Sequence, residues 1–459
     1  MSALVTTAFG YEEDPQGQTA LLEVVPPIDV LESGEETREP TAGTLVLLQE
    51  VGVEDVSVAD LISRAQVGYG HEVIEDSEVT ARSLTYYQLI NDRVLRTHPQ
   101  VSCLSDDEFQ TALADERVGK ITLTDEKGQV HIPVLAPIET YSWLSEEYYG
   151  DTFPDRQVTH FSYLPGFMDQ LGDKLPEGMQ DELRDLIASD GVVVYDIPGS
   201  DPAYGEFIHE TLRTISGEPL PEDKQIGNQH YFASQLKYED GFDDWDYPMD
   251  MMDTYHRMVA LGQAAPEDTQ DGAIAVTELT NGEAEQWWIP YSAGFEPLNK
   301  TNPCRQGMTH DEFIEAMANK DIIKSISFDG GKPVSLLFMG PRMELFPWIS
   351  PAFYANDPRF ARDSSLGKVM YFPHIVVNPE MEGSGRSGDV IGLLTKLGHE
   401  SHNSFIVTFD TCDDNARKVP KIVRIGVKLF GVGDVDFKEI ANHSYHAIDF
   451  SEAAQAATA

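Results

Sequence analysis

The sequence predicts an α+β protein of two tandem domains, each with a mixed, mostly antiparallel sheet flanked by helices. The first observation is composition: 459 residues with 41% hydrophobic side chains suffice for two or three packed domains. The second is an internal repeat, in which residues 97–137 match residues 301–341 without a gap at 11 of 41 positions. The third is that both copies place helix-capping signals before runs of period two, a pattern typical of a helix followed by antiparallel strands.

The repeat continues beyond this block with its order preserved. Trp143 matches Trp348 one residue later in register, and His160 matches His374 after a longer insertion. Agreement of local signals at many positions favours one shared fold for the two copies. We therefore expect Trp143 to occupy the position of Trp348, and His160 that of His374.

The two copies are expected to contain the same elements in the same order. A first strand is predicted at 44–48 and at 273–276, followed by a helical stretch that ends in Thr-x-Pro. Capping boxes at 105–108 and 309–312, a hydroxyl residue followed three positions later by Glu, each start a short helix.

An antiparallel hairpin is predicted after each short helix. Residues 120–125 and 324–329 alternate in period two, and glycine-containing turns follow at 126–128 and 330–332. Each turn is expected to lead into a second strand that returns along the first.

The two copies differ after the hairpin. The second copy has a strand at 371–379, a glycine-rich turn at 380–388 and an amphipathic helix at 389–397. Backbone N–H groups of such a turn, together with the helix N-terminus, can approach an anion such as a diphosphate. The first copy keeps a helix at 179–188 and a strand at 192–195 but lacks the paired glycines. We therefore expect it to bind no cofactor and to help shape a substrate cleft.

The predicted organisation has five parts. The Asp-rich segment between the copies lacks the glycine and terminal Glu of a calcium loop, so it is interpreted as a solvated linker. The boundaries are 1–42 for an acidic arm, 43–235 for the first domain, 236–271 for the linker, 272–450 for the second domain and 451–459 for a tail.

Charge and cysteine usage exclude several classes of function. The formal net charge of −46 disfavours nucleic-acid binding, which needs clustered Lys and Arg. Three scattered cysteines without a CxxC pair predict neither a disulfide framework nor a zinc site. The chain shows no signal-peptide pattern and no long apolar run. A cytoplasmic protein with no membrane partner and no metal is therefore expected, and its oligomeric state is left open.

The strand and glycine-rich turn of the second copy resemble a known motif. Val377-Asn378-Pro379 followed by Gly383-Ser384-Gly385 and a helix is similar to motif A of the GNAT (Gcn5-related N-acetyltransferase) superfamily. The resemblance covers residues 272–450 and extends through the repeat to 43–235, which implies tandem GNAT-like domains of which the first is degenerate. It implies an acyl-CoA substrate, acetyl-CoA or another acyl-CoA, near Val377, Gly383, Gly385, Arg386, Ser387, Gly388 and Asn415.

The resemblance implies a Tyr on the helix near 415–421 that would protonate the leaving thiolate. This helix carries no Tyr and is interrupted by Pro420, so the proton-transfer residues have to be sought elsewhere. His374 is the candidate base, since an imidazole titrates in the useful range, with a core histidine as the alternative. Tyr445 is the candidate acid, with an ordinary strand tyrosine as the alternative. Cys412 is a remote candidate for an acyl carrier.

The predicted function is acyl-CoA-dependent N-acyltransfer, with acetyl transfer to an amine, in the C-terminal domain. The acidic surface would concentrate cationic amines or Lys-containing acceptors. The alternative is a non-catalytic tandem protein with a binding, structural or assembly role. Aminoacyl transfer of the Fem type would need a basic tRNA-binding surface, which a net charge of −46 does not supply.

Overall fold

The fold is known from a computed structural model, which describes residues 58–162, 164, 167–171, 176–189, 191–199, 208, 210, 223–236, 251–260, 272–276, 279–330, 332–378, 380, 390–401, 404–429, 435 and 437–449. The predicted acidic arm, the predicted strand 44–48 and the predicted tail lie outside these residues. Among the described helices, none combines the length and hydropathy needed to cross a bilayer.

The N-terminal unit contains both helices and strands. Its elements are α2 (Val58–Arg64), β1 (Gln66–Gly70), α3 (Ser77–Thr97), α4 (Asp106–Ala114), β2 (Gly119–Asp125), β3 (Gly128–Pro137), the 3₁₀ turn η1 (Ile138–Thr140), α5 (Glu146–Thr152), β4 (Val158–Phe161), α6 (Phe167–Leu171), α7 (Glu177–Ala188), β5 (Val192–Pro198) and β6 (Lys224–Leu236).

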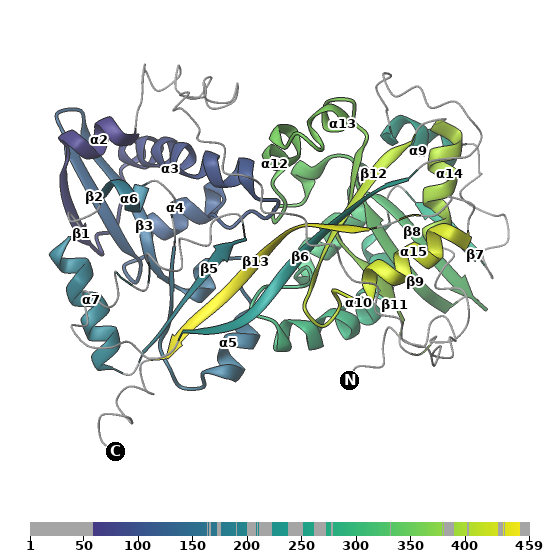
Figure 1. The fold of residues 1–459 in the computed structure, drawn as a ribbon. Coiled ribbons are helices and arrows are strands. Elements are labelled where there is room, and N and C mark those ends of the chain that lie inside the picture. The colour runs from purple at the N-terminus through teal and green to yellow at the C-terminus, as the bar shows by residue number, and fades with distance from the viewer. Residues whose placement is uncertain are drawn as a thin grey trace, which may run out of the picture.

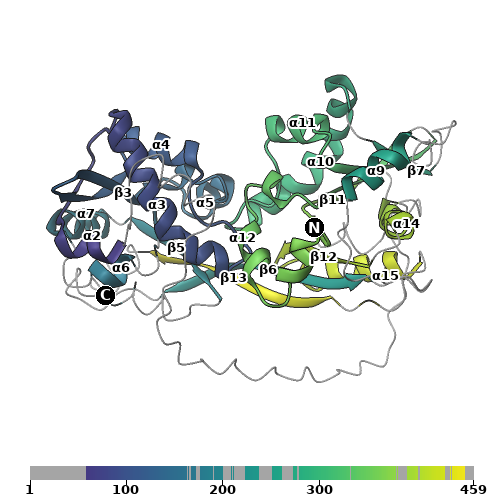
Figure 2. The ribbon, with the colours of Figure 1, turned by 90° about the horizontal axis from the view of Figure 1, so that it is seen from above.

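The C-terminal unit repeats this order. Its elements are α9 (Met251–Ala260), β7 (Gly272–Val276), α10 (Asn281–Thr301), α11 (His310–Ala318), β8 (Ile323–Asp329), β9 (Lys332–Met339), η3 (Met343–Leu345), α12 (Pro351–Asn356), α13 (Ala361–Ser365), β10 (Val369–Phe372), β11 (Ile375–Val377), α14 (Gly392–Ser401), β12 (Phe405–Cys412), α15 (Val419–Leu429) and β13 (Lys438–Asp449). The predicted α+β class and tandem arrangement are thereby confirmed, and Figures 1 and 2 show the units as two lobes side by side.

The last strands of the two units are exchanged. One sheet has the order β1-β2-β3-β4-β5-β13-β6-β12-β10, and the other has the order β11-β9-β8-β7. Strand β13 of the C-terminal unit therefore lies between β5 and β6, while β6 of the N-terminal unit pairs with β12. These two long strands run from one lobe into the other (Figure 1). Each unit is completed by a strand of its neighbour.

Both predicted capping boxes and both predicted hairpins are confirmed. The hydroxyls of Ser105 and Thr309 accept the N–H of Glu108 and Glu312, whose carboxylates accept the cap N–H in return. The hairpins β2–β3 and β8–β9 turn at glycines with positive φ, 124° and 56°, a conformation that glycine adopts without strain. Strand β1 lies beside the first hairpin and pairs antiparallel with β2.

Matched positions of the repeat make the same backbone contact between the two units. The N–H of Val101 donates to the carbonyl of Trp348 at 3.0 Å, and the N–H of Arg305 donates to the carbonyl of Trp143 at 2.8 Å. Val101 and Arg305 are matched positions of the repeat. The two tryptophans therefore occupy equivalent positions, as predicted.

The predicted equivalence of His160 and His374 is wrong. His160 pairs with Ala136 on β3, whereas the matched position on the second copy, Gly340, bridges to Tyr371. The proline before His374 has no N–H to donate, so the strand that corresponds to β4 breaks into β10 and β11 at this point. His374 lies beyond the break, and Tyr371 takes the place of His160.

The predicted solvated linker contains a packed helix. Met251, Tyr255 and Met258 of α9 are buried in a cluster that also contains residues of α14 and β12. This spacing of four and three residues places the three side chains on one face of the helix. The segment is therefore in part a structural element of the C-terminal unit.

Candidate active site

The candidate site lies where two parallel strands of the C-terminal unit separate. Strand β10 pairs with β12 as far as Phe372 and Phe409. Pro373 follows, and the chain resumes as β11 against β9, while β12 continues to Cys412 alongside β6. The sheet is thus open between β11 and the end of β12.

The backbone of β11 faces this opening. The carbonyl of His374 and the N–H of Asn378 bond to β9 at 3.0 and 2.7 Å. Because successive residues of a strand direct their backbone groups to opposite sides, Ile375 and Val377 present theirs to the opening. Among the described strands β11 pairs with β9 alone. An extended ligand could pair with β11 as an additional strand.

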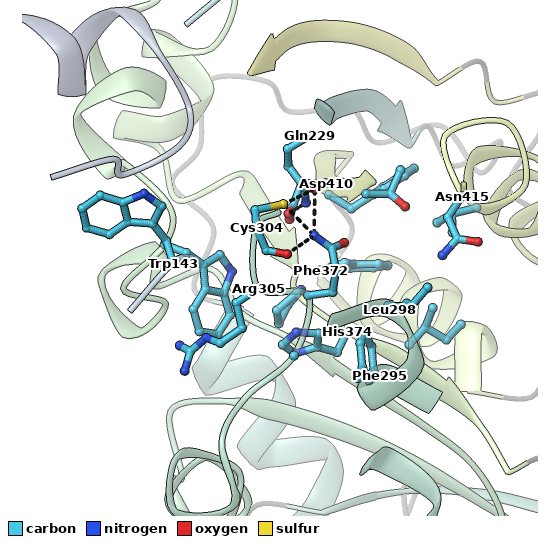
Figure 3. Close-up of a pocket in the computed structure, with 18 of the residues that line it drawn as sticks. Trp143, Gln229, Phe295, Leu298, Cys304, Arg305, Phe372, His374, Asp410 and Asn415 are labelled. Atoms are coloured by element: carbon cyan, nitrogen blue, oxygen red, sulfur yellow. Dashed lines mark hydrogen bonds between the residues drawn. The ribbon is translucent and has the colours of Figure 1, made fainter. Parts of the chain in front are cut away.

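A cavity of about 450 Å³ fills the opening and reaches the boundary between the two units. It is elongated: Asn415 lies at one end and Trp143 and Arg305 at the other, with Asp410 and Cys304 between them (Figure 3). Its lining includes Glu108, Trp143, Gln229, Leu298, Cys304, Arg305, Gln306, Glu312, Trp348, Phe372, His374, Ile375, Val377, Ile391, Asp410, Asn415, Val419 and Ile422.

Two buried polar atoms in the cavity wall lack a partner. Nε1 of Trp143 and Nδ1 of His374 make no hydrogen bond within the part of the chain that the structure describes. Unpaired buried polar atoms are rare in native proteins, because each costs the free energy of losing its water.

Asp410 is a carboxylate in the wall of the cavity, one residue beyond the last pairing of β10 with β12. The hydroxyl of Tyr371 donates to its Oδ1, and Nε2 of Gln229 donates to its Oδ2. The indole N–H of Trp348 in turn donates to the Tyr371 hydroxyl at 2.8 Å. Burial raises the pKa of Asp410, and the hydrogen bonds from Tyr371 and Gln229 offset only part of this increase.

His374 lies in the cavity wall, but its pKa is too low for the predicted role of base. Burial lowers its pKa to about 3, and its ring is surrounded by Tyr291, Phe295, Phe338 and Trp348. An imidazole with this pKa stays neutral at neutral pH and binds a proton weakly. The structure therefore favours the alternative of a histidine held in an aromatic core, with one edge toward the cavity.

Tyr445 does not line the cavity. Its hydroxyl accepts a hydrogen bond from Nε2 of Gln100 at 2.6 Å, and its side chain is 1% exposed. Since β13 is exchanged into the N-terminal unit, the last strand does not form a wall of the opening, contrary to expectation. Cys412 is buried at the end of β12 and is not part of the cavity lining either.

The predicted cofactor-binding residues have mixed outcomes. Val377 and Asn415 line the cavity. Gly383, Gly385, Arg386, Ser387 and Gly388 lie outside the described residues.

The helix predicted near 415–421 begins later than expected. It starts at Val419, so that Pro420 lies in its first turn, where a missing N–H costs no hydrogen bond. Asn415 belongs to the turn before this helix.

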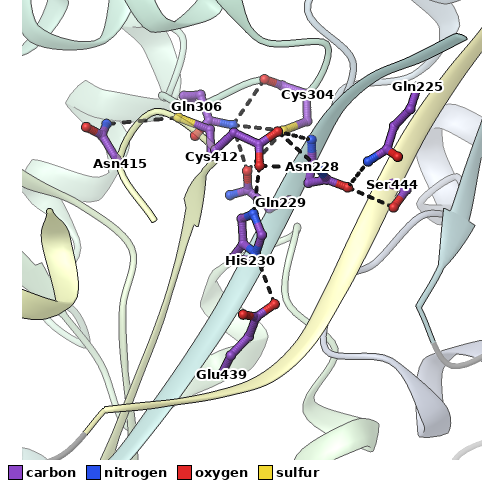
Figure 4. A network of polar contacts seen from close by, with 11 residues as sticks. Gln225, Asn228, Gln229, His230, Cys304, Gln306, Cys412, Asn415, Glu439 and Ser444 are labelled. Atoms are coloured by element: carbon purple, nitrogen blue, oxygen red, sulfur yellow. Dashed lines mark hydrogen bonds and ion pairs between the residues drawn. The ribbon is translucent and has the colours of Figure 1, made fainter. Parts of the chain in front are cut away.

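A polar network holds the turn that carries Asn415 (Figure 4). His230 on β6 contacts Asp413 at 2.8 Å and Glu439 on β13 at 3.0 Å. The N–H of Asn228 donates to Asp413 at 3.0 Å. The hydrogen bond to Glu439 raises the pKa of His230, burial opposes this effect, and the hydrogen bond to Asp413 adds to it. Both exchanged strands thereby help to position the end of the cavity at which Asn415 lies.

Replacing His230 by Gln is expected to lower the free energy of unfolding by about 0.5–1 kcal/mol at pH 6, because both partner carboxylates are nearly half exposed. The pKa of His230 is raised on folding, so this stabilisation is complete below the unfolded pKa near 6.5 and disappears as pH rises through the folded pKa. Urea unfolding of both proteins at pH 6 and pH 9 measures the difference. An equal difference at the two pH values would contradict the prediction.

Sequence reasoning missed Asp410, Gln229 and Cys304. One signal was available: Asp196 and Asp410 are separated by 214 residues, and so are Gln229 and His443, which extends the repeat into the last strands. The contact between Asp410 and Gln229 joins the two units and has no local sequence pattern.

No family model and no curated protein sequence matches the chain. Several solved structures are similar to it over 84% of its length. A tandem GNAT protein from the clavulanic acid biosynthesis pathway has 10% identity, a TM-score of 0.40 and 99% of its own chain covered. A GCN5-related N-acetyltransferase from Sphaerobacter thermophilus has 11%, 0.39 and 96%, and one from Anabaena variabilis has 8%, 0.36 and 73%. By name, these three proteins are of the superfamily that residues 377–385 resemble.

Proposed function

We propose that the chain is an acyl-CoA-dependent N-acyltransferase whose reaction centre is the opening between β11 and β12. The observation that carries this proposal is the cavity at that opening, bordered by the backbone edge of Ile375 and Val377, which no other described strand pairs with. The pantetheine arm of coenzyme A is an extended chain with two amide groups, which such an edge can bind as a strand would. The resemblance of residues 377–385 to an acyl-CoA-binding motif agrees with this placement.

The two ends of the cavity suit the two substrates. Asn415 and α15 lie at the end where the acyl-CoA would enter, and Trp143 and Arg305 lie at the end formed by both units (Figure 3). The acceptor would be a cationic amine or a Lys-containing molecule, attracted by a protein with a net charge of −46. In the reaction the amine nitrogen forms a bond to the thioester carbonyl carbon, the C–S bond breaks, and the products are an amide and the free thiol.

The cavity can be tested by filling it. Leu298 on α10 lines the cavity, so Leu298→Trp is expected to abolish acetyl-CoA binding while the circular dichroism spectrum stays unchanged. Ile289 lies on the same helix, is 71% exposed and is not part of the lining, so Ile289→Trp is the matched control. Isothermal titration with acetyl-CoA should show binding for the wild type and for Ile289→Trp, and no binding for Leu298→Trp.

Two results would contradict the proposal. One is a wild-type protein that gives no heat and no thermal shift with acetyl-CoA. The other is a folded Leu298→Trp variant that binds acetyl-CoA as the wild type does. The second result would leave binding in place but move it away from this cavity.

A further inference from the structure

We infer that Asp410 is the group that takes the proton from the acceptor amine, an assignment that rests on the proposed acyltransferase function. Asp410 lies in the middle of the cavity, between the end assigned to acyl-CoA and the end assigned to the amine (Figure 3). Tyr371 and Gln229 each donate to a different oxygen of its carboxylate. Its orientation is therefore fixed, and the carboxylate, which has about four lone-pair sites, keeps capacity to accept from a ligand.

The N-terminal unit contains the same carboxylate in a different setting. Asp196 is the position of β5 that corresponds to Asp410 on β12. His160 donates to one of its oxygens at 2.8 Å, and His443 donates to the other. Tyr371 stands where the first copy has His160, and Gln229 corresponds to His443 through the same offset of 214 residues. The chain thus holds one carboxylate between two imidazoles and its counterpart between a phenol and an amide.

These different partners shift the pKa values of the two carboxylates in opposite directions. Burial opposes ionisation of Asp196, but attraction to His443 and hydrogen bonds from His160 and His443 outweigh it and hold its pKa well below the usual range. The neutral donors around Asp410 do not compensate for burial, so its pKa is raised. Two like groups with opposite shifts commonly have different roles, and the group with the raised pKa is the better proton acceptor. Asp196 is also absent from the cavity lining.

Of the carboxylates in the cavity lining, Glu312 is paired with Arg305 and Glu108 accepts the cap N–H of Ser105, whereas the side chains that donate to Asp410 are both uncharged. The phenols of Tyr231, Tyr354 and Tyr371 and the thiol of Cys304 feel its negative charge, and burial raises the pKa of each of them. These phenols and this thiol therefore keep their protons and stay uncharged at neutral pH. No basic side chain of the described residues contributes to the pKa of Asp410.

The proton balance of the step is simple. The cationic acceptor first loses its extra proton to solvent. As the nitrogen of the resulting neutral primary amine bonds to the thioester carbonyl carbon, Asp410 accepts one N–H proton. The C–S bond then breaks, and the sulfur leaves with the bonding electrons. The protonated Asp410 can return the same proton to this thiolate, so that amide and thiol are released and the carboxylate is restored. No further reactant is required.

The test compares Asp410→Asn with Asp329→Asn, the same chemical change at a residue on β8 outside the cavity lining. Thiol release from acetyl-CoA is followed with putrescine, lysine, tyramine and ethanolamine as probe amines. Asp410→Asn is expected to lower the rate at least 100-fold while binding acetyl-CoA within twofold of the wild type. Asp329→Asn is expected to keep the wild-type rate.

The pH profile separates proton transfer from a structural role. Tyr371→Phe removes a hydrogen bond to the ionised carboxylate, so the acidic limb of the rate profile should move to higher pH. Asp410→Asn should lose this limb. Equal rates for Asp410→Asn and the wild type would overturn the assignment, as would a wild type that binds acetyl-CoA without releasing thiol to any probe amine. A wild type that does not bind acetyl-CoA would instead overturn the proposed function itself.

Discussion

A chain that ends at residue 436, just before β13, is expected to lose the fold of both units rather than of one. Strand β13 pairs with β5 from His443 to Asp449 and with β6 along most of its length. Its removal takes a central strand out of the nine-stranded sheet and leaves two long edges unpaired. Buried backbone groups that lose their partners are costly, so no partial sheet should remain stable.

Far-UV circular dichroism, size-exclusion chromatography and limited proteolysis would measure this effect. The control is a chain that ends at residue 450, which keeps all of β13. We expect the shorter chain to be degraded throughout and to refold, in part, when a peptide of residues 437–450 is added. If β13 served the C-terminal unit alone, the shorter chain would yield a protease-resistant fragment between about residues 58 and 236. That fragment would contradict the exchanged arrangement.

The sequence predicted those features of the fold that depend on neighbouring residues. Each capping box, at Ser105 or Thr309, joins residues three positions apart. Each hairpin glycine, Gly128 or Gly330, sets the backbone conformation of its own turn. Short-range geometry of this kind is written directly into side-chain type and spacing. The repeat then carried the same interpretation from one unit to the other.

The exchange of strands could not be predicted in this way. Strands β6 and β13 are each the last strand of their unit. The alternation of their side chains between the two faces of the sheet is the same whichever strands lie beside them. The choice of neighbour depends on contacts between segments more than 180 residues apart, such as Gln229 with Asp410. The mistaken match of His160 with His374 has a different and local origin, because the comparison of the two copies overlooked Pro373, at which the strand breaks into β10 and β11.

The exchange also explains why the two carboxylates differ. Asp410 of the C-terminal unit receives Gln229 from β6, and Asp196 of the N-terminal unit receives His443 from β13. Each carboxylate is therefore completed by the other unit. A substitution on one exchanged strand changes the environment in the opposite lobe. This arrangement permits a structural role for one carboxylate and a chemical role for the other.

The same substitution at the two carboxylates is expected to have very different effects on stability. Asp196→Asn places an amide between His160 and His443, whose ring nitrogens are buried, and should lower the free energy of unfolding by about 3 kcal/mol or more. Asp410→Asn should change it by about 1 kcal/mol or less, because Tyr371 can still donate to the amide oxygen and the loss of the bond from Gln229 is offset by the loss of a buried charge.

The pH dependence gives this comparison its sign. The pKa of Asp196 is lowered on folding, so its stabilisation is complete above the unfolded pKa near 4 and is lost as pH falls toward the folded pKa. The difference between wild type and Asp196→Asn should therefore be largest at neutral pH and shrink in acid. The pKa of Asp410 is raised on folding, so its ionised form costs stability, and Asp410→Asn removes that cost. Urea unfolding of the three proteins between pH 3 and pH 7 measures both differences. Equal losses for the two variants, or a loss at Asp196 that persists undiminished in acid, would mean that the imidazoles do not hold Asp196 as an ion, and the contrast that singles out Asp410 would fail with it.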